Sequence, residues 1–178
     1  MSLGVLHART LWPGITILIG LLFSLPSLPA RGELEDPSGW VLICSEESPL
    51  QGLTRRAASR LFLRQGEMLV GGRKVEPVNL ESMKERLAFL SALTRLTPSL
   101  VERHFLELKF RREGDWPSTV SGPNQLIDRL RPDPNYLYVG WLRIETVEKL
   151  PPSSLKGLRL LKLDGKDHSS TEYDLRPR

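Results

Sequence analysis

The chain has 178 residues, of which 40% are hydrophobic and 26% are charged. These proportions are typical of one globular domain and exclude wholesale disorder. The formal net charge is +4, but the basic residues are scattered among acids, so the sequence does not indicate a nucleic-acid-binding surface.

The N-terminal segment has the pattern of a secretory signal peptide. It carries one early positive charge at Arg9 and an apolar core over residues 15–25. We therefore expect a signal peptide over residues 1–30, a linker over 31–39 and one domain over 40–178 that is exported to the periplasm. An uncleaved membrane anchor is the alternative, although the apolar core is short for a span of about 20 residues.

The chain has few residues of the types that catalyse reactions or bind metals, and they are not arranged in known motifs. Cys44 is the only cysteine, so an intramolecular disulfide is excluded. Neither His104 nor His168 has a Cys, Ser or carboxylate partner at catalytic spacing, and the chain contains no phosphate-binding or nucleophile-elbow motif. We predict that the protein is not an enzyme and that it holds no metal and no cofactor.

Strands and helices alternate along the predicted domain. In chain order we expect a strand over 40–44, a helix over 54–66, extended segments over 68–78 with a turn at Gly71-Gly72, a helix over 82–96, a second helix from Thr97, a polar loop over 111–122, a short helix over 123–130, and strands over 136–142 and 158–166. This order predicts an α/β layered domain.

The helix over 82–96 has apolar residues three or four positions apart. We expect this stripe to face the core, and its members are Met83, Leu87, Leu90, Leu93 and Leu96.

Several segments together carry a family resemblance. They are "VLICSEESPLQGLT", "LFLRQG", "GGRKVEPVN", "YLYVGWL" and "LRLLKLDGKDHSSTEYDL". Their order over residues 40–175 resembles one lobe of the periplasmic phosphate-binding proteins that feed ABC transporters. The chain is similar to a short, one-lobed branch of that family, because the other lobe has no counterpart.

The resemblance implies a fold, a ligand and partners. The implied fold is a three-layer α/β single lobe of the type II periplasmic-binding-protein-like class. The implied ligand is phosphate or another small oxyanion, and the implied partner is an ABC permease or another envelope protein.

The loop at residues 79–85 departs from the family pattern. The family carries an Arg, an acid and then Ser-Gly-Thr at the start of a helix, where this chain has Asn79, Glu81 and Met83-Lys84-Glu85. The resemblance therefore implies that the cation, both hydroxyls and the glycine of the phosphate site are missing.

Local chemistry at the same loop also argues against a bound anion. Ser82 and Glu85 fit a capping box, in which the side chains satisfy backbone donors that an anion would need. Glu81 and Glu85 add negative charge at the positive end of the helix, which stabilises the helix by about 0.3–1 kcal/mol for each carboxylate and repels a dianion.

Two functions remain open from the sequence. The first is capture of a small oxyanion by other polar groups, for which the candidate ligand-binding residues are Ser45, Ser48, Asn79, Ser82, Ser118 and Thr119, with Gly52 and Ser121 in the same loops. Ordinary turn chemistry is the alternative role of these residues. The second function is a non-transport interaction module of the envelope that has lost the phosphate site. Trp40 and Trp116 are its candidate contact residues, unless they are buried.

Overall fold

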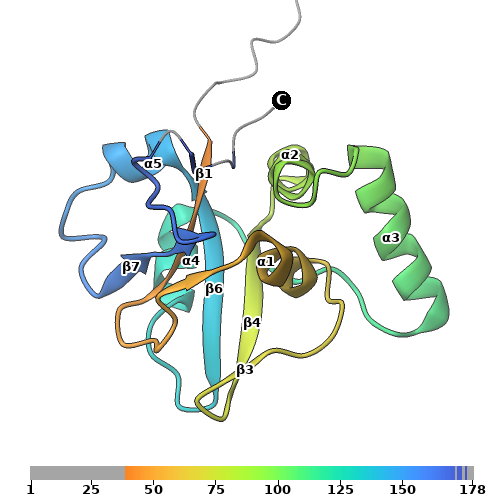
Figure 1. The fold of residues 1–178 in the computed structure, drawn as a ribbon, viewed down its shortest axis with the longest axis horizontal. Coiled ribbons are helices and arrows are strands. Elements are labelled where there is room, and N and C mark those ends of the chain that lie inside the picture. Colours follow the sequence, from red (N-terminus) through yellow and green to blue (C-terminus); the bar gives the residue numbers. More distant parts are fainter. Residues whose placement is uncertain (1–38, 171, 174, 176–178) are drawn as a thin grey trace, which may run out of the picture. The chain divides into compact units, whose positions relative to one another are not determined.

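A computed structural model describes residues 39–170, 172–173 and 175, which belong to one compact unit that spans residues 35–178 (Figure 1). In chain order its elements are β1 (Trp40–Ser45), β2 (Gly52–Leu53), α1 (Arg55–Phe62), β3 (Leu69–Val70), β4 (Arg73–Leu80), α2 (Met83–Thr94), α3 (Pro98–Arg111), β5 (Ser118–Val120), α4 (Pro123–Arg129), β6 (Tyr136–Arg143), α5 (Ile144–Lys149), β7 (Leu158–Leu160) and β8 (Lys162–Leu163). The predicted signal peptide, and the predicted linker up to residue 38, lie outside the described residues.

The main sheet has the strand order β3-β4-β6-β1-β7, and β5 also pairs with β4. β4 runs parallel to both β5 and β6, whereas β1 runs antiparallel to β6 and to β7. A separate parallel pair joins β2 to β8. β4 and β6 therefore form the parallel centre of the sheet.

Helices cover both faces of this sheet. Neighbouring residues of a strand point to opposite faces, and in β6 Trp141 stacks on Phe89 of α2 while Gly140 faces Leu126 of α4. Figure 1 shows α1, α2 and α3 on one side of β4 and β6, with α4 and α5 on the other. The predicted three-layer α/β architecture is confirmed.

Phe89 is the centre of the aromatic core. Its ring lies 4.6 Å from Trp141 in a stacked arrangement, 5.1 Å from Phe62 of α1 and 6.3 Å from Trp40 of β1 in edge-to-face arrangements. All four rings are at most 1% exposed. They join one helical layer to the neighbouring strands β1 and β6 by dense packing of large apolar surfaces.

The C-terminal residues return to the first strand. The N–H of Trp40 donates to the carbonyl of Leu175 at 2.9 Å, and the N–H of Leu42 donates to the Tyr173 hydroxyl at 3.2 Å. The two ends of the described segment are therefore joined at β1.

The structure confirms the predicted turn at Gly71-Gly72 and the predicted helix cap at Thr97. The turn at Gly71-Gly72 joins β3 to β4 with φ angles of 57° and 78°, the positive pair that a two-residue hairpin turn requires. Thr97 caps α3 through its side chain, which accepts from the N–H of Leu100.

The predicted core stripe of α2 is wrong in part. Met83 is 45% exposed, and the buried residues are Arg86, Phe89, Leu90 and Leu93. The buried residues are also spaced three or four positions apart, so spacing alone could not decide whether the side of α2 with Met83 and Leu87 or the side with Arg86 and Phe89 faces the core. The Phe89 ring occupies the space above Trp141 and turns that side of the helix inward.

Other elements differ in extent. The helix predicted over 54–66 ends at Phe62, and the predicted strand over 158–166 divides into β7 and β8, which belong to different sheets. The predicted polar loop contains β5, and α5 follows β6 without any expectation from the sequence. Short strands and helices of this kind depend on tertiary pairing more than on local pattern.

Gly140→Ala should lower the free energy of unfolding by about 1–3 kcal/mol, because overpacking strains a dense core. A Cβ at Gly140 would lie 2.5 Å from Cδ1 of Leu126, which is fully buried. Urea unfolding of Gly140→Ala, Leu126→Ala and the double variant measures the coupling. The cost of the added methyl group should largely vanish when residue 126 is Ala. An equal cost in both backgrounds would show that the close approach is not its cause.

The fold should lose stability at alkaline pH through two buried groups. Burial raises the pKa of the Cys44 thiol to about 11 and the pKa of the Tyr173 hydroxyl to about 12. The unfolded chain releases these protons at lower pH, so the stability that the neutral forms contribute is full below pH 9.0 and falls as the pH rises toward 12. Cys44→Ala should flatten the lower part of this fall in urea unfolding measured across the range. An unchanged slope in that variant would contradict the assignment.

Candidate functional site

Three parallel strands of the sheet end at one edge. α2, α4 and α5 begin shortly after the last residues of β4, β5 and β6. In open α/β sheets, ligands bind outside the C-terminal ends of the strands. We call this region the strand-end edge and define it by Glu81, Ser82, Glu85, Ser121 and Arg143.

The start of α2 is occupied by groups of the chain itself. Ser82 Oγ accepts from the N–H of Glu85 at 3.4 Å, which confirms one half of the predicted capping box; among the described residues the Glu85 carboxylate makes no return bond to the N–H of Ser82. The carboxylate of Glu85 is engaged by Arg143, whose Nε donates to Glu85 Oε1 at 3.1 Å. Arg143 also lies over the ring of Trp40, with 5.5 Å between Cζ and the ring centroid. An ion pair therefore lies at the helix start where the resemblance implied an anion.

Asn79 lies beneath this edge rather than on it. Its side chain is 0% exposed, and Trp141 Nε1 donates to Asn79 Oδ1 at 2.9 Å. Asn79 Nδ2 is buried without a hydrogen-bond partner among the described residues. The prediction that Asn79 contacts a ligand does not fit this position, because the amide supports the core indole and does not reach the surface.

Ser118 and Thr119 lie next to β4. The register of β5 places Ser118 beside Val78 and Thr119 beside Asn79, and Ser118 Oγ donates to the carbonyl of Pro77 at 3.4 Å. Thr119 is exposed. The fold thus brings Asn79, Ser118 and Thr119 to neighbouring positions on β4 and β5, and Ser82 follows β4 as the N-cap of α2.

Ser45 and Ser48 lie at the other end of the strands, because β1 is antiparallel to β6. Their hydroxyls accept from the backbone N–H groups of Glu47 and Leu50, each at 3.2 Å, which is the turn chemistry considered as their alternative role. Both side chains are buried beside a cavity of only about 10 Å³, the space of roughly one water molecule. The structure does not bring them together with Ser82.

Arg86 is a buried cation that the sequence reasoning did not single out. Its side chain is 7% exposed, and Cζ lies 4.5 Å from the ring centroid of Trp116, which itself stacks on Phe105 at 3.9 Å. Burial lowers the pKa of Arg86, and its Nε has no hydrogen-bond partner among the described residues. Nη2 lies 3.2 Å from the sulfur of Met83.

The two tryptophans predicted as contact residues pack inward to different degrees. Trp40 is 1% exposed and belongs to the core, so its role as a surface contact is wrong. Trp116 is half-buried between Arg86 and Phe105.

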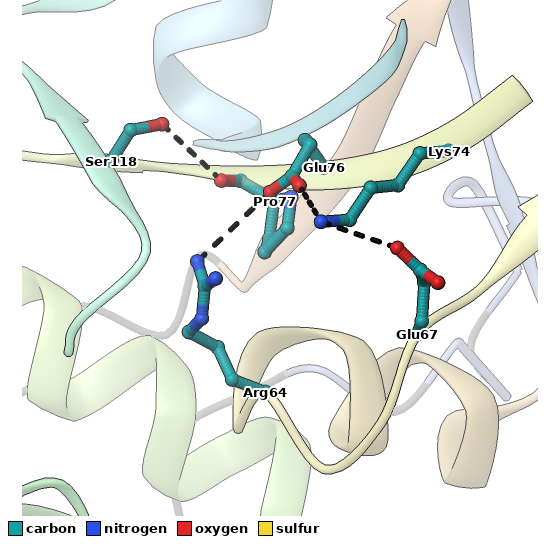
Figure 2. A network of polar contacts seen from close by, with 6 residues as sticks. All are labelled: Arg64, Glu67, Lys74, Glu76, Pro77 and Ser118. Atoms are coloured by element: carbon teal, nitrogen blue, oxygen red, sulfur yellow. Dashed lines mark hydrogen bonds and ion pairs between the residues drawn. The ribbon is translucent and has the colours of Figure 1, made fainter. Parts of the chain in front are cut away.

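A charged pocket of about 180 Å³ lies between the end of α1 and the first half of β4. Figure 2 shows its polar network: Lys74 Nζ lies 2.8 Å from Glu76 and 3.3 Å from Glu67, and Arg64 lies 3.9 Å from Glu76. Glu76 is the main cause of a raised pKa of Lys74. Since Glu113 also lines the pocket, three carboxylates face two cations, and a phosphate would have to displace existing ion pairs.

Within the described ranges, no group of three or more His, Cys, Asp or Glu residues is placed to hold a metal ion. The helices of the same ranges are all too short or too polar to cross a membrane.

Sequence reasoning missed Arg143 and the pocket residues for a definable reason. Arg143 follows the strand predicted over 136–142, but only the parallel pairing of β4 with β6 places it beside Glu85. A prediction of that pairing would have revealed the contact, since parallel strands end at the same edge.

No model of a known protein family matches the chain, and no curated protein matches it. Solved structures do. An ABC-type phosphate transport receptor from Vibrio cholerae aligns with a TM-score of 0.54 and 17% identity over 79% of this chain and 54% of its own. PstS from Borrelia burgdorferi aligns with a TM-score of 0.55 and 16% identity over 79% of this chain and 55% of its own.

A phosphate ABC transporter substrate-binding protein from Clostridium perfringens, solved with bound phosphate, aligns with a TM-score of 0.52 and 14% identity over 79% of this chain and 53% of its own. The chain thus spans about half the length of each of these proteins. At such identities the likeness is one of fold. The chain has the fold of about half of a phosphate-transport substrate-binding protein, as expected of a one-lobed branch.

Proposed function

We propose that this chain is an exported, solute-binding-protein-like domain of the periplasm that works by contacting an envelope protein and does not carry phosphate. An ABC permease is the partner class that the fold suggests first. The solved proteins of similar fold are binding proteins, which supports a role in binding rather than in catalysis. The signal-peptide pattern of residues 1–30 supports export.

The ion pair between Glu85 and Arg143 carries the proposal. Both groups lie at the start of α2, where unpaired backbone N–H groups and the helix dipole otherwise favour an anion. Glu85 supplies negative charge there, and Arg143 is already engaged by it at 3.1 Å. An incoming phosphate would have to break this pair and accept the repulsion of Glu81 and Glu85.

Capture of a small oxyanion is the second candidate function, and Arg86 is the observation that favours it. A guanidinium that is 7% exposed without an ion pair to a carboxylate of the described residues is costly to retain. Such a cation in the first turns of α2 would favour an anion if the helix start opened. Its Nε is inaccessible in the present arrangement, so this function requires a rearrangement around Trp116.

Arg86→Met should leave the free energy of unfolding within about 1 kcal/mol of the wild-type value or raise it. Met retains the apolar contacts with Trp116 and removes a desolvated charge, whereas the lost cation–π contact contributes about 0.5–2 kcal/mol. Urea unfolding measures the difference, with Arg86→Ala as the variant that also removes packing volume. A loss well above 2 kcal/mol in the Met variant would mean that the charge itself supports the fold.

Calorimetric titration of the purified protein with inorganic phosphate tests the proposed function. We expect no binding heat up to roughly millimolar phosphate, because the α2 start is filled. Glu85→Gln removes one carboxylate and the ion pair that it forms with Arg143, so this variant should bind phosphate measurably more tightly than the wild type. Glu113→Gln, on the charged pocket, is the matched control and should behave as the wild type does.

Micromolar binding by the wild-type protein would overturn the proposal and restore phosphate capture as the function. The same titration of Glu113→Gln would then show whether the charged pocket takes part. A wild-type protein without binding, together with Glu85→Gln that gains it, would identify the ion pair as the group that closes the site.

A further inference from the structure

α3 has two apolar stripes on nearly opposite sides. Val101 and Phe105, at 0% and 1% exposure, face α2 and the core. Leu106 and Phe110 are 55% and 85% exposed. With 3.6 residues in each turn, Leu106 and Phe110 lie one turn apart and point away from the buried pair.

The outward stripe has no cover from the described part of the chain. Figure 1 shows α3 at the outer right of the unit, beyond α2, with its length running along the outside. Contacts with the unit come from its inner side, where His104 Nε2 lies 2.8 Å from the carbonyl of Leu63 and Phe105 stacks on Trp116. The outer side therefore presents a free helical ridge.

Charges beside the ridge have mixed signs in a definite order. Glu107 and Arg111 are exposed, lie one turn apart on the same flank of the Leu106–Phe110 line, and differ in sign. Glu107 also pairs with Arg103 of its own helix at 3.2 Å, an exposed contact that leaves its second oxygen for another partner. An antiparallel two-fold pairing of two helices brings the same flank of each copy together, with the residue order reversed. Glu107 of one copy would then lie beside Arg111 of the other, and the contact would occur twice.

This charge order favours a second copy over other occupants. An anionic membrane surface attracts clusters of one sign, whereas α3 carries both signs, with the acids Glu102 and Glu107 and the bases Arg103, Lys109 and Arg111. A self-complementary surface needs both signs on the same patch, together with an apolar centre.

We propose that α3 is a self-association surface through which two copies of this chain pair, with their α3 helices antiparallel. Leu106 and Phe110 of each copy form the apolar centre, and Glu107 pairs with Arg111 of the second copy on the flank. The pairing does not depend on the proposed function, because it uses the outer side of α3 and not the strand-end edge.

Sedimentation velocity of the purified protein over a dilution series tests the pairing. The wild-type dimer fraction should rise with concentration, and Phe110→Ser should weaken association by about tenfold or more. Leu69→Ser is the matched control, since Leu69 is another exposed apolar residue, at 62%, on the distant strand β3. This control should associate as the wild type does.

Charge reversal supplies the sharper test. Glu107→Lys alone and Arg111→Glu alone should each weaken the dimer, and the double variant should restore it, because the pair is then attractive with its signs exchanged. Thermal unfolding of each variant confirms that the fold is kept. A monomeric wild type at all concentrations, an equal effect of Leu69→Ser, or no restoration in the double variant would overturn the proposal. Binding to phosphatidylglycerol vesicles without self-association would overturn it as well.

Discussion

The stacked contact between Phe89 and Trp141 is the constraint on which most of this fold depends. It joins α2 to the central strand β6 at a ring distance of 4.6 Å, and it sets which side of α2 faces inward. Because Trp141 points to this face, Gly140 must point to the other, where Leu126 of α4 comes too close for any larger residue. One pair of rings therefore fixes the rotation of a helix and the packing on both faces of the sheet.

The indole of Trp141 also explains why the residue at position 79, below the strand-end edge, is uncharged. Trp141 donates to Asn79, so the side chain at this position of β4 supports the core, and a cation there would have neither space nor solvent. Two cations near the start of α2 were not anticipated from the resemblance: Arg143, which comes from β6, and Arg86, which belongs to α2 itself. The uncharged side chain at position 79 and the aromatic packing around it are thus parts of one arrangement.

Sequence reasoning predicted the features that depend on local chemistry. The hairpin at Gly71-Gly72, the caps at Ser82 and Thr97 and the alternation of strands and helices all follow from short-range rules. Sequence reasoning failed for elements and buried residues that depend on contacts between segments far apart in the chain. The three-residue strand β5 exists because β4 offers it a partner, and Arg86 is buried because Trp116, thirty positions later, covers it. Spacing along α2 allowed either of two sides to face the core, and the packing of Phe89 on Trp141 decides between them.

The return of the C-terminal residues to β1 has a consequence for the order of events during synthesis. The backbone N–H groups of Trp40 and Leu42, at the start of the domain, find their partners at Leu175 and Tyr173. Until Tyr173 and Leu175 have been synthesised, the first strand lacks these two hydrogen bonds. β1 therefore completes its backbone hydrogen bonding only after most of the domain has been synthesised, so the packing around the first strand is completed late.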